Sequence, residues 1–487
     1  MKAFNTRHGK DNMDMVDNAS SNKNPFSHFF EPESLAIIGS LKEGGFGGYV
    51  VVKSLLAAGY KGKIFPINPS APEVLGIKSY SSVTEVPGPI DLALIMINAR
   101  NVAAVMEACA QKGVRAVVVV ADGFAERDAQ GAQLQDELVA IGKRRGIRII
   151  GPNTAGIANA INGLNPCPYD AGYYDFRKGP ISICAQSGMI NPQAFAYPHM
   201  RFGISKICDF GNKCDLDESD LLDYLETDAS TGVISMYLET IRDGRRFIDT
   251  CRRVSAKKPI LALKLGTTPE GAQASQSHTG SMAVDDAVFH SACAQAGVLR
   301  IQEFGELFEL PKVFAAQPLP RGNRFGMVSY TGGVGVVAAD EGGKYGLVMA
   351  ELSPETARMF DEIFPGLGSM PVDLGPMIPV VKDFALVYSK ILKAVLDDTE
   401  VDALFNVLWA DAHGNNTRAY IEACEELKIH TNKPVVTWVY GPNPDSILDL
   451  TEKVEELGFP VFSTPERCVK ALGLTVRYAA LNGRKTH

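Results

Sequence analysis

The chain has 487 residues, which at roughly 150 residues per domain is enough for about three domains. Hydrophobic residues make up 46% of it and charged residues 21%. These proportions are typical of a soluble globular enzyme and exclude a disordered or fibrous chain. The formal net charge of −8 argues against nucleic acid or an anionic membrane as a general partner. No run of about 18 apolar residues occurs, so we expect no membrane-spanning segment.

The cysteine pattern argues against a disulfide framework. Nine cysteines are scattered through mostly apolar runs, and no C-x-x-C spacing occurs. Cys208 and Cys214 lack both the spacing and the second pair of a zinc site, so we expect no bound metal. Reduced thiols favour a cytoplasmic location. Residues 1–23 are polar and lack the apolar core of a signal peptide or anchor, and we interpret them as a disordered tail.

From residue 24 onward, short β-branched runs alternate with longer amphipathic stretches. A βαβ series of this kind builds a parallel sheet. The first predicted domain covers residues 24–170 and has a helix over 50–58, after a glycine loop. Its predicted strands are 34–39, 63–68, 91–97, 116–121 and 148–151.

Two further series follow the same plan. The second predicted domain, 171–320, closes with a helical stretch over 305–316 and a proline-bearing linker, 317–322. The third covers residues 321–487. Their predicted strands are 181–185, 233–238, 259–265, 324–330, 346–352, 402–409, 434–439 and 460–462. We therefore predict an α/β protein of three consecutive doubly wound units.

Each unit opens with a strand that runs into a Gly/Ser-rich turn and then a helix. The turns lie at 39–48, 185–188 and 331–335. In such a turn, backbone N–H groups and the helix dipole converge on one spot that suits a phosphate. Three turns at equivalent positions predict anion-binding loops more strongly than one would.

Other nucleotide-binding motifs are missing. An NAD site needs G-x-G-x-x-G and an acidic residue after the second strand, where this chain has Asn68-Pro69-Ser70. The G-K-[ST] tripeptide of a P-loop does not occur. Residues 209–211, Asp-Phe-Gly, imitate a kinase signature without its catalytic loop, and we interpret them as a coincidence.

His278 lies in a small, polar segment, 273–281. A lone histidine is most often a surface-loop residue, but these small neighbours leave the imidazole accessible and could surround an anion. A histidine nucleophile needs an acceptor on one ring nitrogen. Glu239 follows the strand 233–238 at the same predicted sheet edge and is a candidate for that acceptor. Periodicity alone leaves both interpretations open.

Residues 277–281, Ser-His-Thr-Gly-Ser, resemble the phosphohistidine segment of the NDP-forming acyl-CoA synthetases. This superfamily includes the succinyl-CoA synthetase alpha-subunit and the ADP-forming acetyl-CoA synthetases. Further segments resemble family signatures in the family's order, and together they cover nearly the whole chain after the tail. They are Gly-Pro-Asn at 151–153, Gln-Ser-Gly at 186–188, Gly-Asn-Lys at 211–213, Tyr-Leu-Glu at 237–239, Asp-Gly-Arg-Arg-Phe at 243–247 and Pro-Val-Asp-Leu at 371–374.

The resemblance implies a CoA-binding, Rossmann-like domain followed by two flavodoxin-like domains of the succinyl-CoA synthetase type. The first domain is then expected to bind coenzyme A. The residues that the resemblance assigns to CoA are Gly39, Ser40, Phe46, Gly47, Gly48, Asn68, Ser70, Val120, Ala121 and Asp122.

The resemblance also implies that His278 is phosphorylated and that Glu239 orients it. Two helix openings are expected to face the phosphohistidine, since helix N-termini stabilise an anion. Their residues are Gln186, Ser187, Gly188, Gly332 and Gly333. In the implied mechanism, phosphate attacks an acyl-CoA and gives an acyl phosphate and CoA. His278 takes the phosphoryl group, releases the carboxylic acid and passes the phosphoryl group to ADP or GDP, and every step is reversible.

Three positions depart from the family pattern. The family usually has a lysine just after the Asn-Pro of the second strand, where this chain has Ser70. Asn191 and Pro192 stand where relatives have small or aromatic residues near the acyl group, so they are candidate acid-pocket residues. The segment 409–415 replaces a more apolar family segment.

Three α/β units fill the chain and leave no room for the family's nucleotide-binding ATP-grasp module. The resemblance therefore implies an ATP-grasp beta-type partner that carries Mg²⁺ and ADP/ATP or GDP/GTP, in a hetero-oligomer of the alpha2beta2 type. The alternative is a non-catalytic CoA-binding regulatory or scaffold protein with the same fold. Ser70 favours this alternative, whereas the presence of His278 and Glu239 opposes it.

Overall fold

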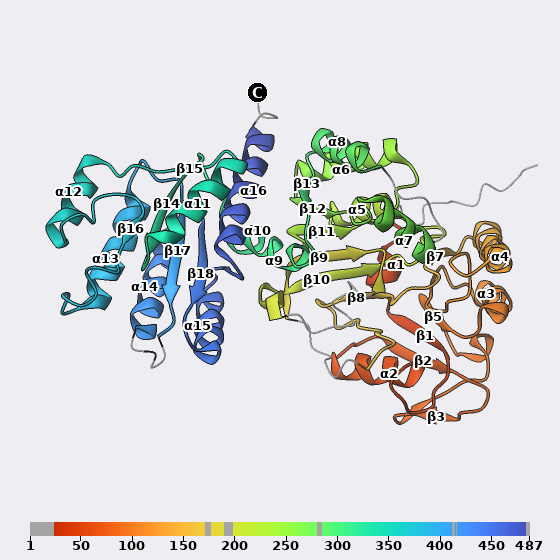
Figure 1. Cartoon of the computed structure of the whole chain (residues 1–487). Coiled ribbons are helices and arrows are strands. Elements are labelled where there is room, and N and C mark those ends of the chain that lie inside the picture. The colour runs from red at the N-terminus through yellow and green to blue at the C-terminus, as the bar shows by residue number, and fades with distance from the viewer. Residues whose placement is uncertain are drawn as a thin grey trace, which may run out of the picture.

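The computed structural model describes residues 24–170, 177–188, 198–279, 285–411, 414 and 416–483, without the side chains of 275–279 and 429–430. The predicted tail, 1–23, lies outside these residues. Three mainly parallel sheets follow one another along the chain, each with helices on both faces (Figure 1). The prediction of an α/β protein with three doubly wound units is confirmed.

The first sheet is fully parallel, in the order β2-β1-β5-β6-β7. Its strands are β1 (Ser34–Gly39), β2 (Lys63–Ile67), β5 (Leu92–Met96), β6 (Ala116–Val119) and β7 (Arg148–Ile150). Strand β1 lies between β2 and β5, so the sheet grows from β1 to β2 on one side and then from β1 to β5, β6 and β7 on the other. This flavodoxin-type order opens a crevice at the carboxyl ends of β1 and β5.

Alternation of side chains decides which helix covers which face of this sheet. Leu35 and Ile37 of β1 face a cluster that contains the buried residues of α2, whereas Ala36 and Ile38 face the buried residues of α3 and α4. These helices are α2 (Gly48–Ala57), α3 (Ala99–Lys112) and α4 (Ala129–Arg145).

The second sheet has the order β13-β12-β11-β9-β10-β8. Its strands are β8 (Ile157–Asn159), β9 (Lys178–Ala185), β10 (Ile204–Asp209), β11 (Val233–Tyr237), β12 (Ile260–Leu263) and β13 (Leu299–Ile301). All pairs are parallel except β8 with β10. One face packs on α5, α6 and α8, and the other on α9 and α10. These helices are α5 (Glu218–Leu225), α6 (Gly244–Ser255), α8 (Asp286–Ala296), α9 (Glu306–Glu309) and α10 (Pro311–Ala316).

The third sheet repeats the strand arrangement of the first, in the order β15-β14-β17-β18-β19, and β16 also pairs with β14. Its strands are β14 (Arg324–Ser329), β15 (Val348–Met349), β16 (Val372–Asp373), β17 (Ala403–Trp409), β18 (Val435–Tyr440) and β19 (Val461–Phe462). Helices α11 and α16 pack on one face, and α13 and α14 on the other. The helices of this domain are α11 (Gly333–Lys344), α12 (Pro354–Ile363), α13 (Phe384–Asp397), α14 (Thr417–His430), α15 (Pro444–Glu456) and α16 (Pro465–Gly483).

Strand β10 is a strand that the sequence analysis did not predict. Ser205 and Lys206 interrupt its apolar pattern, yet both are buried. Their polar groups have partners more than 20 residues away in the sequence, because Ser205 Oγ lies 2.8 Å from Thr231 Oγ1 and Lys206 Nζ donates to Asp228 Oδ2 at 3.1 Å. Buried polar side chains with partners of this kind are invisible to a periodicity argument.

The chain crosses between the first two sheets more than once. Strand β8 joins the second sheet, although it precedes residue 170. The chain then returns to the first domain, where Gly47 N donates to Pro168 O at 3.0 Å. Between the domains, Arg148 holds Asp215 with two hydrogen bonds of 2.9 and 3.1 Å. The boundary at residue 170 thus remains a prediction.

All nine cysteines are free and buried. Burial keeps their thiols protonated, and raises the pKa of Cys109, for example, to about 12. Across the described part of the chain, no helix is both long and apolar enough to cross a bilayer.

Buried ion pairs join the second and third domains. The Lys312 ammonium of α10 is fully buried and lies 2.7 Å from the Glu455 carboxylate of α15. It also donates to the carbonyl oxygen of Val461. Nearby, Lys470 of α16 lies 2.5 Å from Glu306 of α9. Because these charges have lost their water, each depends on its partner, and the pairs fix how the domains join.

We predict that Lys312→Ala lowers the stability of the folded chain by about 3–5 kcal/mol, because it leaves the Glu455 carboxylate buried and uncompensated. Thermal and urea unfolding of the full chain measure the effect. Lys393→Ala, which removes an exposed ion pair with Asp397, serves as the control and is expected to leave the midpoint unchanged. A wild-type midpoint for Lys312→Ala would contradict the account.

Candidate functional site: a groove at the carboxyl edges of two sheets

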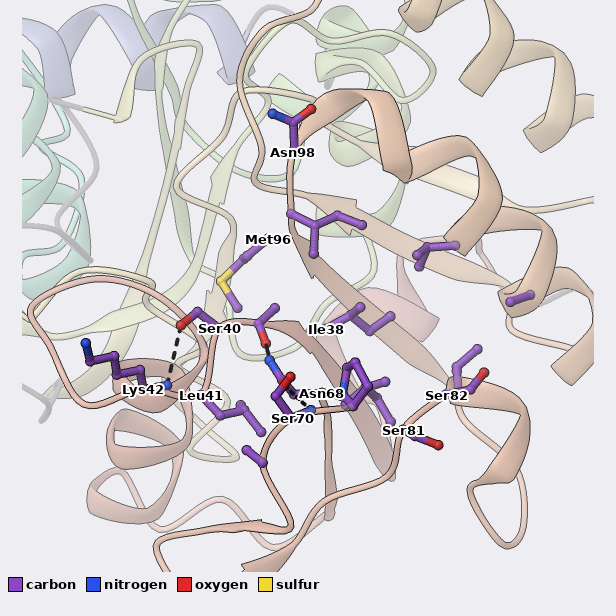
Figure 2. A pocket seen from close by; sticks show the side chains of 18 residues that line it. Ile38, Ser40, Leu41, Lys42, Asn68, Ser70, Ser81, Ser82, Met96 and Asn98 are labelled. Atoms are coloured by element: carbon purple, nitrogen blue, oxygen red, sulfur yellow. Dashed lines mark hydrogen bonds between the residues drawn. The ribbon is translucent and has the colours of Figure 1, made fainter.

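A cavity of about 730 Å³ lies in the crevice between β1 and β5 (Figure 2). Apolar side chains such as Ile38, Ile67 and Val105 line part of it, and a polar rim surrounds them. The rim residues are Ser40, Lys42, Asn68, Ser70, Ser81, Ser82 and Asn98. An apolar floor with a polar rim suits a ligand that has both a flat ring system and charged groups.

Close backbone approach requires glycine at the mouth of this crevice. A Cβ on Gly39 would lie 2.7 Å from the carbonyl oxygen of Met96, at the ends of the paired strands β1 and β5. Next to it, Asn68 Nδ2 donates to Gly39 O at 2.7 Å, and Asn68 Oδ1 accepts from Ser70 N at 2.8 Å. The Asn68 amide therefore fixes the turn that follows β2.

The backbone of the first glycine loop is partly engaged within the protein. Gly47, at a φ of +113°, donates its N–H to Pro168 O at 3.0 Å, and Gly48 donates to Ser40 O at 2.9 Å. These two N–H groups therefore already have acceptors. Neither glycine lines the cavity, whereas the predicted residues Gly39, Ser40, Asn68 and Ser70 do.

A second cavity, of about 560 Å³, continues from the first. The two share Met96, Ile97 and Asn98 as a common wall. The second cavity is lined by the predicted residues Phe46, Val120, Ala121, Asp122 and Gly188 and also by Asn153, Thr154, Ala155, Tyr169 and Asp209. The two cavities are therefore neighbours, and together they are called the groove, which extends from the first domain to Gly188 at the start of the second glycine loop.

Tyr169 and Asp209 are among the residues of this second cavity that the sequence analysis did not predict. Tyr169 packs against Phe46 with a ring-centroid distance of 5.2 Å, and backbone pairing between the same two residues holds them together. Asp209, which the sequence analysis dismissed as part of a coincidental motif, is buried and accepts from Ala155 N at 2.6 Å. It lies at the carboxyl end of β10, so the sequence could have identified it only if that strand had been predicted.

Gln186 bridges the crevice of the second sheet. It follows β9, and its side-chain oxygen accepts from Glu239 N at 2.7 Å and from Thr240 N at 3.0 Å. Its amide nitrogen donates to Thr240 Oγ1 at 3.0 Å. Gln186 therefore positions the residues that follow β11.

Glu239 is buried at this edge, at an exposure of 4%. The Tyr237 hydroxyl donates to Glu239 Oε1 at 2.8 Å. Burial, and the carboxylate beside it, raise the pKa of Tyr237 well above its usual value, so the hydroxyl stays a donor. From the other side, Lys213 Nζ donates to Thr240 O and to Glu218 Oε2, both at 2.7 Å. Hydrogen bonds from Tyr237, Gln186 and Lys213 thus fix the Glu239 carboxylate and the backbone of residues 239–240.

Several predicted residues fall at the limit of the described structure. Ser187 and Gly188 are half-buried, and a Cβ on Gly188 would lie 3.5 Å from Asp209 Oδ2. Asn191 and Pro192 lie outside the described residues. His278 lies in α7 (Pro269–Thr279), which follows β12 at the same edge as Glu239, but its side chain is outside the described part.

Gly332 and Gly333 open α11 in the third domain and are exposed. The Asp373 carboxylate, at the end of β16, lies against this opening, since a Cβ on Gly332 would be 3.4 Å from its Oδ2. A carboxylate is stabilised by the positive end of the helix dipole. That this opening faces His278 remains a prediction.

The groove fits coenzyme A in its chemistry. The first cavity offers apolar walls for a base and hydroxyl and amide groups for ribose and phosphate, while the second cavity continues toward Gly188. Among the described residues, no three His, Cys, Asp or Glu side chains are grouped to hold a metal ion. Fold and groove together define an α/β protein that binds a nucleotide-like ligand at the carboxyl edge of a parallel sheet.

Comparisons with known proteins agree. Residues 33–160 match a family described as a CoA binding domain, and residues 178–314 match a succinyl-CoA ligase like flavodoxin domain. The chain is 33% identical over 472 residues to the alpha subunit of an acetate–CoA ligase [ADP-forming] I of Pyrococcus furiosus, covering 92% of this chain and 97% of the relative. The chain belongs to the family of ADP-forming acyl-CoA ligases, as an alpha-type subunit.

Longer relatives and solved structures extend the comparison. An acetate–CoA ligase [ADP-forming] II of Archaeoglobus fulgidus is 36% identical over 92% of this chain, which spans only 66% of that relative. A structure of a dinucleotide forming acetyl-coenzyme A synthetase 1 from Ca. Korarchaeum cryptofilum, in complex with phosphate and ADP, superimposes with a TM-score of 0.85. It is 32% identical, covering 95% of this chain and 99% of the other.

We predict that Gln186→Ala destabilises the second domain by about 1–3 kcal/mol, because the buried N–H of Glu239 loses its acceptor. Urea unfolding of the full chain measures this loss. Gln111→Ala, on the exposed side of α3, is the matched control and is expected to be neutral. Equal stability of the two variants would show that the bridge contributes nothing.

Proposed function

We propose that this chain is the alpha-type subunit of an NDP-forming acyl-CoA synthetase that interconverts a carboxylic acid, CoA and a nucleoside triphosphate with acyl-CoA, the diphosphate and phosphate. The observation that carries the proposal is the groove. It joins the crevice of the first sheet, through Met96–Asn98, to Gly188 beside the crevice of the second.

Each part of the groove suits one part of the reaction. The base and phosphates of CoA are expected in the first cavity, beside Ser40, Asn68 and Ser70. The thiol arm then passes Met96 to Asn98 into the second cavity. This path brings a thioester to the second glycine loop, which is predicted to open a helix whose backbone N–H groups suit a phosphate. Phe46 and Tyr169 form the wall beside the acyl group.

His278 and Glu239 are proposed to act together in phosphoryl transfer. The acyl phosphate formed from thioester and phosphate transfers its phosphoryl group to one ring nitrogen of His278, and the P–O bond to the carboxylic acid breaks. Glu239 accepts a hydrogen bond from the other ring nitrogen and holds the neutral tautomer that attacks. The Tyr237 hydroxyl and the Gln186 bridge keep that carboxylate in place.

The second half of the reaction requires a partner. Phosphohistidine passes its phosphoryl group to ADP or GDP, which we assign, with Mg²⁺, to an ATP-grasp beta-type subunit. Two relatives support this division. The chain covers 97% of one that is named an alpha subunit, but only 66% of a longer one that is not named as a subunit. We further propose an alpha2beta2 hetero-oligomer in the cytoplasm, with domains at 24–170, 171–320 and 321–487. In it, Gly332 and Gly333 open a second helix toward the phosphate.

We predict that the chain, mixed with its ATP-grasp partner and γ-³²P-ATP, becomes labelled in a base-stable and acid-labile form. His278→Ala is expected to abolish labelling and CoA-dependent ADP release, because the nucleophile is gone. His290→Ala removes an exposed histidine of the same domain and is expected to label as the wild type does.

Two outcomes would count against the enzyme. Full labelling of His278→Ala would remove that residue from the mechanism. CoA binding by the wild type with no phosphoryl transfer, even with the partner present, would support the CoA-binding regulatory or scaffold protein in its place.

A further inference from the structure

The first cavity is lined by one positively charged side chain, to which the family resemblance gives no role. Lys42, on the glycine loop, is the single Lys or Arg among the residues that line this cavity. It is exposed and forms no ion pair with another described residue. Figure 2 shows it on the glycine-loop side of the cavity, with Ser40 beside it and Asn68 and Ser70 nearer the middle.

The opposite end of the cavity does not favour an anion. There the Ser81 hydroxyl donates to both carboxylate oxygens of Glu85, at 2.7 Å each. This carboxylate would repel a phosphate, whereas the apolar Val83 and Ala108 at the same end suit a base. The charged groups of a nucleotide-containing ligand therefore belong at the end with Lys42.

Backbone donors on the glycine loop are also fewer than its composition suggests. The N–H groups of Gly47 and Gly48 are engaged with Pro168 O and Ser40 O. Binding of a polyanion at this end therefore depends more on a positively charged side chain. Ser70 cannot provide that charge, since it has only a hydroxyl. A four-carbon stem lets the Lys42 ammonium move over the rim to meet a phosphate.

We propose that Lys42 is the phosphate-binding cation of the CoA site and replaces the charge that a lysine at position 70 would supply. This inference rests on the proposed function, since it takes CoA as the ligand of the first cavity. It deepens that proposal by naming the residue on which the affinity for CoA depends. The ammonium pairs either with the diphosphate or with the 3′-phosphate of CoA, since both are dianionic groups.

Calorimetric titration of the full chain with CoA tests the proposal. Lys42→Ala is expected to weaken binding about fivefold to tenfold at low salt, as for a partly exposed ion pair, and the difference is expected to shrink as salt is added. Lys61→Ala, which removes an exposed lysine of the same domain, is the matched control and is expected to bind CoA as the wild type does.

A second variant moves the charge back to the family position. Ser70 is exposed, and only its backbone N–H donates to the Asn68 side chain. Ser70→Lys therefore preserves that hydrogen bond. In the Lys42→Ala background, Ser70→Lys is expected to restore most of the affinity. Titration with dephospho-CoA identifies the partner. If Lys42→Ala weakens the binding of CoA but not of dephospho-CoA, Lys42 pairs with the 3′-phosphate. If it weakens the binding of both ligands, Lys42 pairs with the diphosphate.

The results separate this inference from the proposed function. If the wild type and Lys42→Ala bind CoA within twofold of each other, Lys42 is not the phosphate-binding cation, although the CoA site stands. If the wild type does not bind CoA at all, the proposed function fails together with this inference.

Discussion

The placement of β1 between β2 and β5 determines where a ligand can bind in this protein. Because the loops that follow β1 and β5 lead to helices on opposite faces of the sheet, a crevice opens between these loops at the carboxyl edge. Gly39 permits the close approach of β1 and β5 at that point. The same arrangement, with the first strand of the unit between its two neighbours, recurs around β9 and β14. The glycine loops, Glu239 and Asp373 all lie at these edges.

Joining two crevices into one groove depends on rigid coupling between domains. Arg148 and Asp215 connect the end of the first sheet to the loop after β10, and one continuous hydrophobic cluster extends from Leu35 to Phe247. The second and third domains are joined differently, by the buried pairs Lys312–Glu455 and Lys470–Glu306 together with apolar contacts. Buried ion pairs add little net free energy to folding, but a domain arrangement that separates the two charges is strongly disfavoured. Such a joint suits domains that must present their edges in a fixed relation.

The sequence was sufficient to predict the parallel sheets, because buried strands such as 34–39 are continuous apolar runs between glycine turns. It was not sufficient for β10, whose buried Lys206 and Ser205 depend on partners distant in the chain. For the site, the predicted strands place Gly39 and Glu239 at sheet edges, whereas their roles come from the family resemblance. Tyr169 could not be found in this way, because only the return of the chain to the first domain brings it into the groove. Asp209 could not be found either, because it ends β10, which the sequence did not predict. The engaged N–H groups of Gly47 and Gly48 are likewise a tertiary effect.

The central claim is that one groove carries CoA from the first sheet to the edge of the second. A crystal structure of the full chain with bound CoA tests it most directly. The account predicts the phosphates beside Ser40 and Asn68, and the thiol between Met96 and Gly188. A thiol that points out past Ser81, or a CoA molecule bound away from the carboxyl ends of β1 and β5, would contradict it.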